Sequence, residues 1–195
     1  PSVYIGRIMA TELIISISGM RGIIGDNLTP AIAAEYGCAF GTFLKNNKSG
    51  GGKLKVCLGR DSRPSGQMLA SAVMSGLCAV GVDVVDLGIV MVKHLSCDGG
   101  VVLTASHNPI EYNGIKLLLG NGIAPPKELS GEIRNRYFEK NFETVKSVDC
   151  GHIVQNDETD EVHIEKVTAI VDRDLIASKN YKVVLDSVNG AGGRI

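Results

Sequence analysis

The highest density of reactive residue types lies in two adjoining segments, Thr104–Pro109 with the sequence TASHNP and Tyr112–Lys116 with the sequence YNGIK. Ser106 offers a hydroxyl, which becomes a good nucleophile only when a neighbouring group activates it. Lys116 is the single charge in the apolar run Gly114–Gly120. A lone ammonium in such a run requires an anion or a route to water. These two segments are therefore the first candidate for a functional site.

The order of the predicted elements explains how these side chains come together. Val101–Thr104 and Ile115–Leu119 have the apolar, β-branched character of short strands. Asn113–Gly114 is a dipeptide typical of a tight hairpin turn, so we expect the two strands to run antiparallel. An antiparallel return brings Lys116 back close to Ser106.

A purely structural interpretation also exists for each of these residues taken alone. Ser106 would cap a turn, Asn108 and Pro109 would shape that turn, and Lys116 would extend its ammonium to solvent. Pro109 prevents the loop from continuing as a helix, and Asn108 favours a turn. We therefore expect Ser106 on a rigid, partly exposed loop. The residues taken together, in this order and spacing, favour a functional site over turn chemistry.

The remaining elements alternate between strands and helices, which is typical of an α/β domain. Thr29 and Pro30 predict a helix start, with Thr29 as the N-cap and Pro30 in the first helical position. Gly22 and Gly25 predict a loop after a first strand at 12–18. The predicted hairpin makes the sheet mixed, so we expect a mixed β-sheet packed between helices. The other predicted elements are helices at 30–44, 66–80, 128–140 and 160–171, strands at 53–58, 82–87 and 182–186, and connections at 45–53 and 141–159.

The bulk composition excludes several classes of function. The 195 residues are 44% hydrophobic, as in a globular domain. Twenty basic against 21 acidic residues give a net charge of −1, so no global field points to nucleic acid or to a membrane surface. We recognise no apolar run of about 18 residues and no signal peptide. Five cysteines without a Cys-x-x-Cys spacing are expected to be reduced thiols in a cytoplasmic protein.

Several segments resemble, in order, the motifs of the α-D-phosphohexomutase superfamily, which includes phosphoglucomutase, phosphomannomutase and phosphoglucosamine mutase. TASHNP and the following YNGIK are similar to the phosphoserine loop of that family. Ser18–Gly22 (SGMRG) resembles its N-terminal Gly-x-Arg-Gly loop, and Gly59–Gly66 (GRDSRPSG) resembles its Gly-Arg-Asp-x-Arg segment. Val184–Asp186 with Asn189–Gly192 resembles the opening strand of its second domain. Matches in family order across nearly the whole chain are more specific than one short motif.

The resemblance implies that Ser106 is phosphorylated in the resting protein and gives its phosphoryl group to a hexose monophosphate. The hexose 1,6-bisphosphate intermediate then turns around and returns its other phosphate to Ser106, which moves phosphate between positions 1 and 6. Such transfer depends on positioning and on charge stabilisation. Arg21 and Lys116 are expected beside the transferring group, where either also manages a proton. His107 is expected to bond to the phosphate or the substrate, or else to fix the loop.

The resemblance also suggests binding residues and a metal. Asn108 and Arg60 are the candidates for substrate binding, although an ion pair with Asp61 behind the site is the better interpretation of Arg60. The family uses Mg²⁺, held by the serine phosphate and by an Asp-x-Asp-x-Asp motif that this sequence lacks. Ser106, through its phosphate oxygen, is therefore the single metal ligand that we name.

The extent of the resemblance leaves several alternatives open. Family members have about four domains, so we assign residues 1–155 to the first domain and 156–195 to the start of a second, and we expect this fragment alone to be inactive. The short Gly88–Gly99 segment is either a true deletion or reflects unresolved residues. A serine hydrolase would need a Gly-x-Ser-x-Gly elbow, which Ser106 lacks, and nothing favours a phosphatase. A non-catalytic sugar-phosphate-binding module remains the alternative if the fragment is the whole natural product. The sequence chooses neither among glucose, mannose and glucosamine phosphates nor among oligomeric states.

Overall fold

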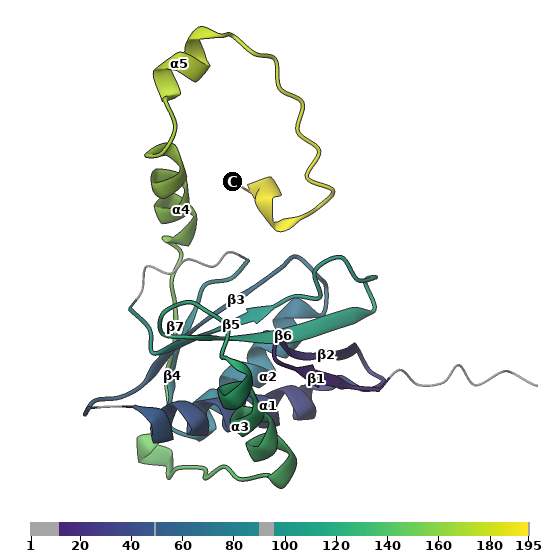
Figure 1. Ribbon diagram of the computed structural model, residues 1–195, viewed down its shortest axis with the longest axis vertical. Helices are drawn as coiled ribbons and strands as arrows, with labels where there is room; N and C mark the ends of the chain where they lie inside the picture. Colours follow the sequence, from purple (N-terminus) through teal and green to yellow (C-terminus); the bar gives the residue numbers. More distant parts are fainter. Residues whose placement is uncertain (1–11, 49, 90–95, 195) are drawn as a thin grey trace, which may run out of the picture.

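The computed structural model describes residues 12–48, 50–89 and 96–194, and its centre is one seven-stranded β-sheet (Figure 1). The strands are β1 (Ile14–Ser16), β2 (Gly19–Ile23), β3 (Lys55–Arg60), β4 (Asp83–Asp86), β5 (Gly99–Leu103), β6 (Tyr112–Leu119) and β7 (Ile153–Gln155). They lie in the order β1-β2-β6-β5-β3-β4-β7. The pairs formed among β3, β4, β5 and β7 are parallel, whereas every pair that includes β2 or β6 is antiparallel. The predicted mixed sheet of an α/β fold is therefore confirmed.

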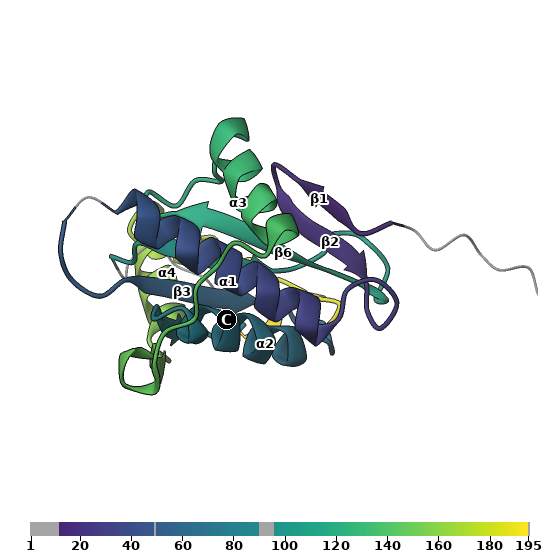
Figure 2. The same ribbon diagram turned by 90° about the horizontal axis from the view of Figure 1, so that it is seen from below.

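Three helices cover one face of this sheet, as Figure 2 shows. The helices of the chain are α1 (Pro30–Asn47), α2 (Gly66–Ala79), α3 (Lys127–Glu139), α4 (Thr159–Thr168) and α5 (Arg173–Ser178). The first three form the covering layer, and their apolar sides build the core with fully buried residues such as Phe40, Phe43, Leu58, Leu77 and Leu103. Thr29 caps α1 as predicted, because its side chain accepts a hydrogen bond from the Ile32 amide.

The prediction of a loop around Gly22 and Gly25 is wrong for the first part of that stretch. Gly19–Ile23 forms β2, which pairs with β1 on one side and with β6 on the other. A Cβ atom on Gly22 would lie 2.4 Å from the side-chain oxygen of Asn27, so a close approach explains the glycine. Arg21 is consequently held on a strand with neighbours on both sides.

The prediction of a turn at Asn113–Gly114 is also wrong, because both residues lie inside β6. Asn113 is fully buried, and its amide donates to Ser65 Oγ at 2.9 Å and accepts from the Gly114 N–H at 2.8 Å. These partners satisfy an amide that would otherwise favour a turn. The chain reverses between β5 and β6 through residues 104–111, which contain Ser106.

The residues after 140 differ most from the prediction. β7 lies within the stretch 141–159 predicted as a connection, and it pairs in parallel with β4. Residues 182–186 form no strand, and Val183, Val184 and Leu185 are at least 77% exposed. A strand needs a neighbour for its backbone N–H and C=O groups, and none of the described strands pairs with this segment. Figure 1 shows the chain beyond β7 extending away from the helix-covered face of the sheet.

Three further points concern the chain as a whole. No helix in the described ranges combines the length and the apolar character that crossing a membrane requires. None of the five cysteines, which all lie within the described residues, forms a disulfide. The question of a deletion between Gly88 and Gly99 falls mainly on residues 90–95, which lie outside the described residues.

Candidate active site around Ser106

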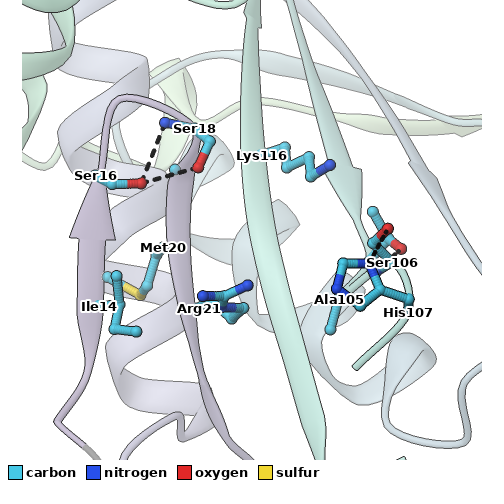
Figure 3. A pocket seen from close by; sticks show the side chains of 11 residues that line it. Ile14, Ser16, Ser18, Met20, Arg21, Ala105, Ser106, His107 and Lys116 are labelled. Carbon is cyan, nitrogen blue, oxygen red and sulfur yellow. Dashed lines mark hydrogen bonds between the residues drawn. The ribbon is translucent and has the colours of Figure 1, made fainter. Parts of the chain in front are cut away.

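A cavity of about 260 Å³ opens where the β1–β2 hairpin, β6 and the loop after β5 meet (Figure 3). Its lining residues are Ile14, Ser16, Ser18, Gly19, Met20, Arg21, Thr104, Ala105, Ser106, His107 and Lys116. This set contains two basic side chains, Arg21 and Lys116, and no carboxylate, so the local field favours an anion even though the chain is close to neutral. The cavity therefore brings together the four residues predicted to be catalytic.

Ser106 has a φ of 57°, a left-handed conformation that is uncommon for a residue with a side chain. Its amide donates to Thr104 Oγ1 at 2.9 Å, and the Asn108 amide donates to the Ala105 carbonyl at 3.1 Å. Backbone conformations of this kind require about 1–3 kcal/mol from the surrounding structure. The structure places Ser106 on an exposed loop; that the loop is rigid stays a prediction.

The Ser106 hydroxyl has one side-chain neighbour that can exchange a proton with it. Nδ1 of His107 lies 3.4 Å from Ser106 Oγ, and the tautomer of the imidazole decides which atom donates. Both side chains are exposed at the cavity. This arrangement suits a histidine that bonds to a group carried by Ser106.

The two cations reach the cavity from different strands. Lys116 lies on β6 opposite Val102 of β5, and Figure 3 shows its ammonium turned toward Ser106. Arg21 lies on β2, and its Nη1 donates to Asn108 Oδ1 at a long 3.4 Å. Both side chains are exposed, so their positive charges remain available to a ligand.

Two serine hydroxyls on the opposite wall were missed as separate features by the sequence reasoning. Ser16 and Ser18 lie at the turn of the β1–β2 hairpin, and their Oγ atoms are 2.8 Å apart (Figure 3). Ser18 belongs to the SGMRG motif, whereas Ser16 precedes it and carries no sequence signal of its own. Both add hydrogen-bonding capacity to a wall that otherwise consists of apolar side chains and Arg21.

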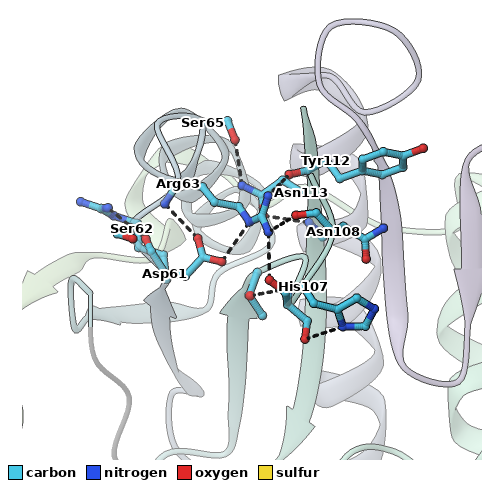
Figure 4. Close-up of polar contacts among 12 residues, drawn as sticks. Asp61, Ser62, Arg63, Ser65, His107, Asn108, Tyr112 and Asn113 are labelled. Carbon is cyan, nitrogen blue, oxygen red and sulfur yellow. Dashed lines mark hydrogen bonds and ion pairs between the residues drawn. The ribbon is translucent and has the colours of Figure 1, made fainter. Parts of the chain in front are cut away.

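Arg63 lies behind the loop, and its guanidinium bonds to three backbone carbonyls of the loop and to that of Tyr112 at the start of β6 (Figure 4). Nη2 donates to the carbonyl oxygens of Ser106 at 3.0 Å and Asn108 at 2.7 Å. Nη1 donates to those of Pro109 at 2.7 Å and Tyr112 at 3.1 Å. Arg63 lies within the GRDSRPSG segment, but nothing in the sequence indicates this role.

Asp61 completes this arrangement and corrects the prediction for Arg60. The Asp61 carboxylate accepts from Arg63 Nε at 3.2 Å and from the Arg63 amide at 3.1 Å. Arg60 instead donates to Gln67 Oε1 at 3.0 Å and to the Asp61 carbonyl at 3.5 Å. The expected Arg60–Asp61 ion pair is therefore wrong, because both carboxylate oxygens are directed at Arg63. Arg60 lies outside the lining of the cavity, and its role in substrate binding stays a prediction.

The described residues do not form a complete Mg²⁺ site. Mg²⁺ prefers near-octahedral coordination by oxygen, and within 12–48, 50–89 and 96–194 no group of three or more His, Cys, Asp or Glu side chains is arranged to hold a metal. A phosphate on Ser106 would supply oxygen ligands from one side alone. The assignment of Ser106 as a metal ligand therefore stays a prediction.

Comparisons with known proteins agree with this geometry. Residues 13–144 match the family described as phosphoglucomutase/phosphomannomutase, alpha/beta/alpha domain I. A phosphoglucomutase/phosphomannomutase of Thermococcus kodakarensis is 41% identical over 181 residues, which are 89% of this chain and 39% of the relative. A phosphoglucosamine/phosphogalactosamine mutase of Sulfurisphaera tokodaii is 36% identical, with 96% of this chain and 40% of the relative covered.

A solved structure supports the same assignment. The phosphoglucomutase/phosphomannomutase family protein of Burkholderia thailandensis superposes with a TM-score of 0.64 at 31% identity, covering 82% of this chain and 37% of that one. The chain spans about two fifths of the length of the curated relatives named above. The chain belongs to the phosphoglucomutase/phosphomannomutase family.

Proposed function

We propose that this chain carries the phosphoserine of a phosphohexomutase, and that Ser106 is the residue that holds the phosphoryl group. The observation that carries the proposal is the cavity, in which an exposed serine in a left-handed conformation meets two cations and no carboxylate. Phosphoryl transfer depends on positioning and electrostatic stabilisation more than on covalent help from other side chains. A serine that shares its cavity with Lys116 and Arg21 meets both requirements.

The reaction consists of two transfers between oxygen atoms. In the first, the bond between phosphorus and Ser106 Oγ breaks while a bond forms from phosphorus to a hydroxyl oxygen of the hexose monophosphate. That hydroxyl loses its proton, and Ser106 Oγ gains one. After the hexose 1,6-bisphosphate has turned around, the reverse transfer takes its other phosphate back to Ser106. Phosphate has then moved between positions 1 and 6 without loss of a phosphoryl group.

The neighbouring side chains have separate tasks in these transfers. Lys116 and Arg21 stabilise the negative charge that spreads over the transferring phosphoryl oxygens. Lys116 or Arg21 also takes part in the transfer of the proton of the reacting hydroxyl. His107, at 3.4 Å from Ser106 Oγ, bonds to the phosphate. Asn108 Oδ1 and the Arg21 guanidinium together orient the substrate.

The wider assignment follows from the family. We assign residues 1–155 to a first domain and 156–195 to the start of a second. Hexose phosphates and hexose 1,6-bisphosphates are the proposed ligands, and the relatives carry names for both plain and amino sugars. We propose Mg²⁺ as the cofactor on the basis of the family resemblance, although the described residues do not form a complete site for it. Five cysteines that form no disulfide support a cytoplasmic location.

Phosphopeptide mapping of the full-length protein, before and after incubation with a hexose 1,6-bisphosphate, tests the proposal. We expect phosphate on Ser106, increased by the bisphosphate and abolished in Ser106→Ala. Ser18→Ala is the matched control, because Ser18 lines the same cavity and is equally exposed to the ligand. A folded protein that leaves Ser106 unmodified under both conditions would overturn the proposal.

A further inference from the structure

The guanidinium of Arg63 has no unused hydrogen-bond donor. An arginine side chain carries five N–H donors in a planar fork. Its Nε bonds to Asp61, and its two terminal nitrogens bond to the carbonyl oxygens of Ser106, Asn108, Pro109 and Tyr112. The side chain is 12% exposed; its bonds to Asp61, Asn108 and Tyr112 are partly buried, and those to Ser106 and Pro109 lie at the surface. Five matched donors on one guanidinium indicate a group shaped for this loop.

We propose that Arg63 is the positioning residue for Ser106, acting through the backbone of residues 106–112. This inference rests on the proposed function for Ser106 and extends it to a residue outside the cavity. Arg63 is absent from the cavity lining, so it acts without touching the substrate or the transferring group. Its partner Asp61 follows β3 directly and donates its own amide to the Leu103 carbonyl at the end of β5. We call the Arg63 guanidinium with its bonds to residues 106–112 the clamp; through Asp61 it is anchored to the sheet.

The loop has a physical need for such a clamp. It leaves β5 after Leu103 and returns as β6 at Tyr112, so its carbonyls have no strand partner of their own. Buried carbonyls without a partner are unfavourable. Arg63 bonds to three of them, at Ser106, Asn108 and Pro109, and thereby supports the left-handed conformation of Ser106. Its fourth carbonyl partner is Tyr112, the first residue of β6. One side chain therefore replaces the hydrogen bonds that regular secondary structure would supply.

The clamp also fixes the orientation of the peptide between Ser106 and His107. In a trans peptide the C=O and N–H bonds point in opposite directions. Because the Ser106 carbonyl bonds to Arg63, the His107 N–H points away from the guanidinium, and the negative end of the peptide dipole is directed behind the loop. Rotation of this peptide would move a carbonyl oxygen to the other side, where it would repel a phosphate. Arg63 thus keeps the loop ready for an anionic group.

Lysine cannot reproduce this geometry. Its ammonium has three donors on a single nitrogen atom, whereas the four carbonyls approach two separate nitrogens of a planar group. We therefore expect the fork, and not only the charge, to be required. This distinction separates a positioning role from a general need for a cation near the cavity.

The test compares Arg63→Met and Arg63→Lys with wild type in the full-length protein. Arg134→Met serves as the matched control, because Arg134 is exposed on α3 and contacts the Phe138 ring at 5.6 Å. Hydrogen exchange of the peptide 104–112, followed by mass spectrometry, reports on the loop whether or not the protein is a mutase. Mutase assays give kcat and KM separately, and free guanidinium at non-denaturing concentration is added to Arg63→Ala to attempt rescue.

We expect faster exchange in 104–112 for both Arg63 variants and unchanged exchange for the control. We also expect kcat to fall about 100-fold in Arg63→Met and about 10-fold in Arg63→Lys, with KM within about threefold of wild type. Free guanidinium should restore part of kcat in Arg63→Ala.

Two outcomes would overturn the inference. One is unchanged loop exchange in Arg63→Met, and the other is a change confined to KM or to global stability with kcat intact. A wild-type protein without phosphate on Ser106 would overturn the proposed function instead, and the exchange result would then still decide whether the clamp exists.

Discussion

The two sides of the loop at 104–111 hold their arginines in different ways. On the cavity side, the exposed Arg21 makes one long contact of 3.4 Å to Asn108, and Lys116 is exposed as well. On the rear side, Arg63 is largely buried, and its five bonds lie between 2.7 and 3.2 Å. On the cavity side, the charges of Arg21 and Lys116 are not tied to a carboxylate of the lining. On the rear side, Arg63 is fully hydrogen-bonded but does not line the cavity.

This difference separates binding from preorganisation. A cation that stabilises a transferring phosphoryl group must not be neutralised by the protein itself, so the cavity side leaves Arg21 and Lys116 without a carboxylate among the lining residues. A loop that must hold Ser106 in a left-handed conformation needs bonds that fix its backbone, and Arg63 supplies them. Substitutions on the two sides should therefore fail in different measurements.

The largest effect is expected for Lys116→Met on the cavity side. The loss of charge stabilisation and of a proton carrier should lower kcat about 1,000-fold. The free energy of unfolding should stay within about 0.5 kcal/mol, because the side chain is exposed. Lys55→Met is the control, since Lys55 is also exposed on a strand but lies on β3, two strands from β6 and outside the cavity lining. Equal activities of the two variants would place Lys116 outside the chemistry.

A smaller effect on activity is expected for Arg21→Met. We predict a fall in kcat/KM of about 100-fold, because a cation beside the transferring group is lost. Hydrogen exchange of 104–112 should remain at the wild-type rate, since Arg21 makes a single long contact to the loop. Faster hydrogen exchange of 104–112 in Arg21→Met would show that Arg21 also holds the loop, and would contradict the assignment of that role to Arg63.

Asn113→Ala probes the support that β6 gives to the rear side. The substitution removes the bond to Ser65 Oγ and leaves that hydroxyl without its buried partner. The free energy of unfolding should fall by about 1–3 kcal/mol. Urea unfolding measures the change, with Asn121→Ala as the control, because the Asn121 side chain is exposed and accepts its bond from the Ile123 amide at the surface. An unfolding free energy within error of that control would show that the buried amide contributes nothing.

Thr104→Val tests a single bond at the base of the loop. The Thr104 hydroxyl accepts from the Ser106 amide at 2.9 Å, and valine keeps the shape without the acceptor. We expect the free energy of unfolding to fall by about 1 kcal/mol and kcat to fall about fivefold. Thr104→Ser keeps the hydroxyl and should retain nearly wild-type kcat. Equal kcat values for Thr104→Val and Thr104→Ser would show that the bond does not contribute to the positioning of Ser106.

The smallest effect is expected far from the loop, at Asp83. Burial alone would raise its pKa, but the His152 amide and the Lys53 ammonium outweigh burial and hold the pKa below the ordinary carboxyl value. A lowered folded-state pKa stabilises the protein above about pH 4, and this stabilisation is lost as the pH falls through the folded value. Asp83→Asn should therefore lose about 0.5 kcal/mol at neutral pH, a difference that shrinks in acid.

Unfolding at several pH values measures this contribution. Activity should not change between wild type and Asp83→Asn at neutral pH, because Asp83 lies outside the cavity lining. A stability difference that stays constant from neutral to acid pH would contradict the role given to the carboxylate.

Much of the fold is predictable from local patterns in the sequence. The capping residue Thr29 and the apolar periodicity locate α1 and α2 within a few residues. The errors arise where tertiary contacts override local propensity. Asn113–Gly114 has the composition of a turn, but the bond from Asn113 to Ser65 holds it in a strand. Residues 182–186 have strand composition without a strand partner in the described chain.

The residues that line the cavity are largely predictable from the sequence, but the bonds of Arg63 and Asp61 that hold the loop from behind are not. The sequence brings Ser106, His107 and Lys116 together because they are neighbours in one hairpin, and the motif resemblance adds Arg21. No pattern in the sequence shows that Arg63 rather than Arg60 pairs with Asp61, because both arginines are within two residues of the carboxylate. That choice depends on the direction in which the chain leaves β3.

A single-turnover experiment tests the central claim most directly. The full-length protein is phosphorylated with a hexose 1,6-bisphosphate, freed of ligand and mixed with a hexose monophosphate, and the phosphate on Ser106 is followed by mass spectrometry. We predict that wild type transfers its phosphoryl group to the sugar within one turnover, that Lys116→Met keeps it far longer, and that Arg63→Met loses it slowly. Release of the phosphate to water, or its absence from Ser106 in a folded protein, would contradict the account.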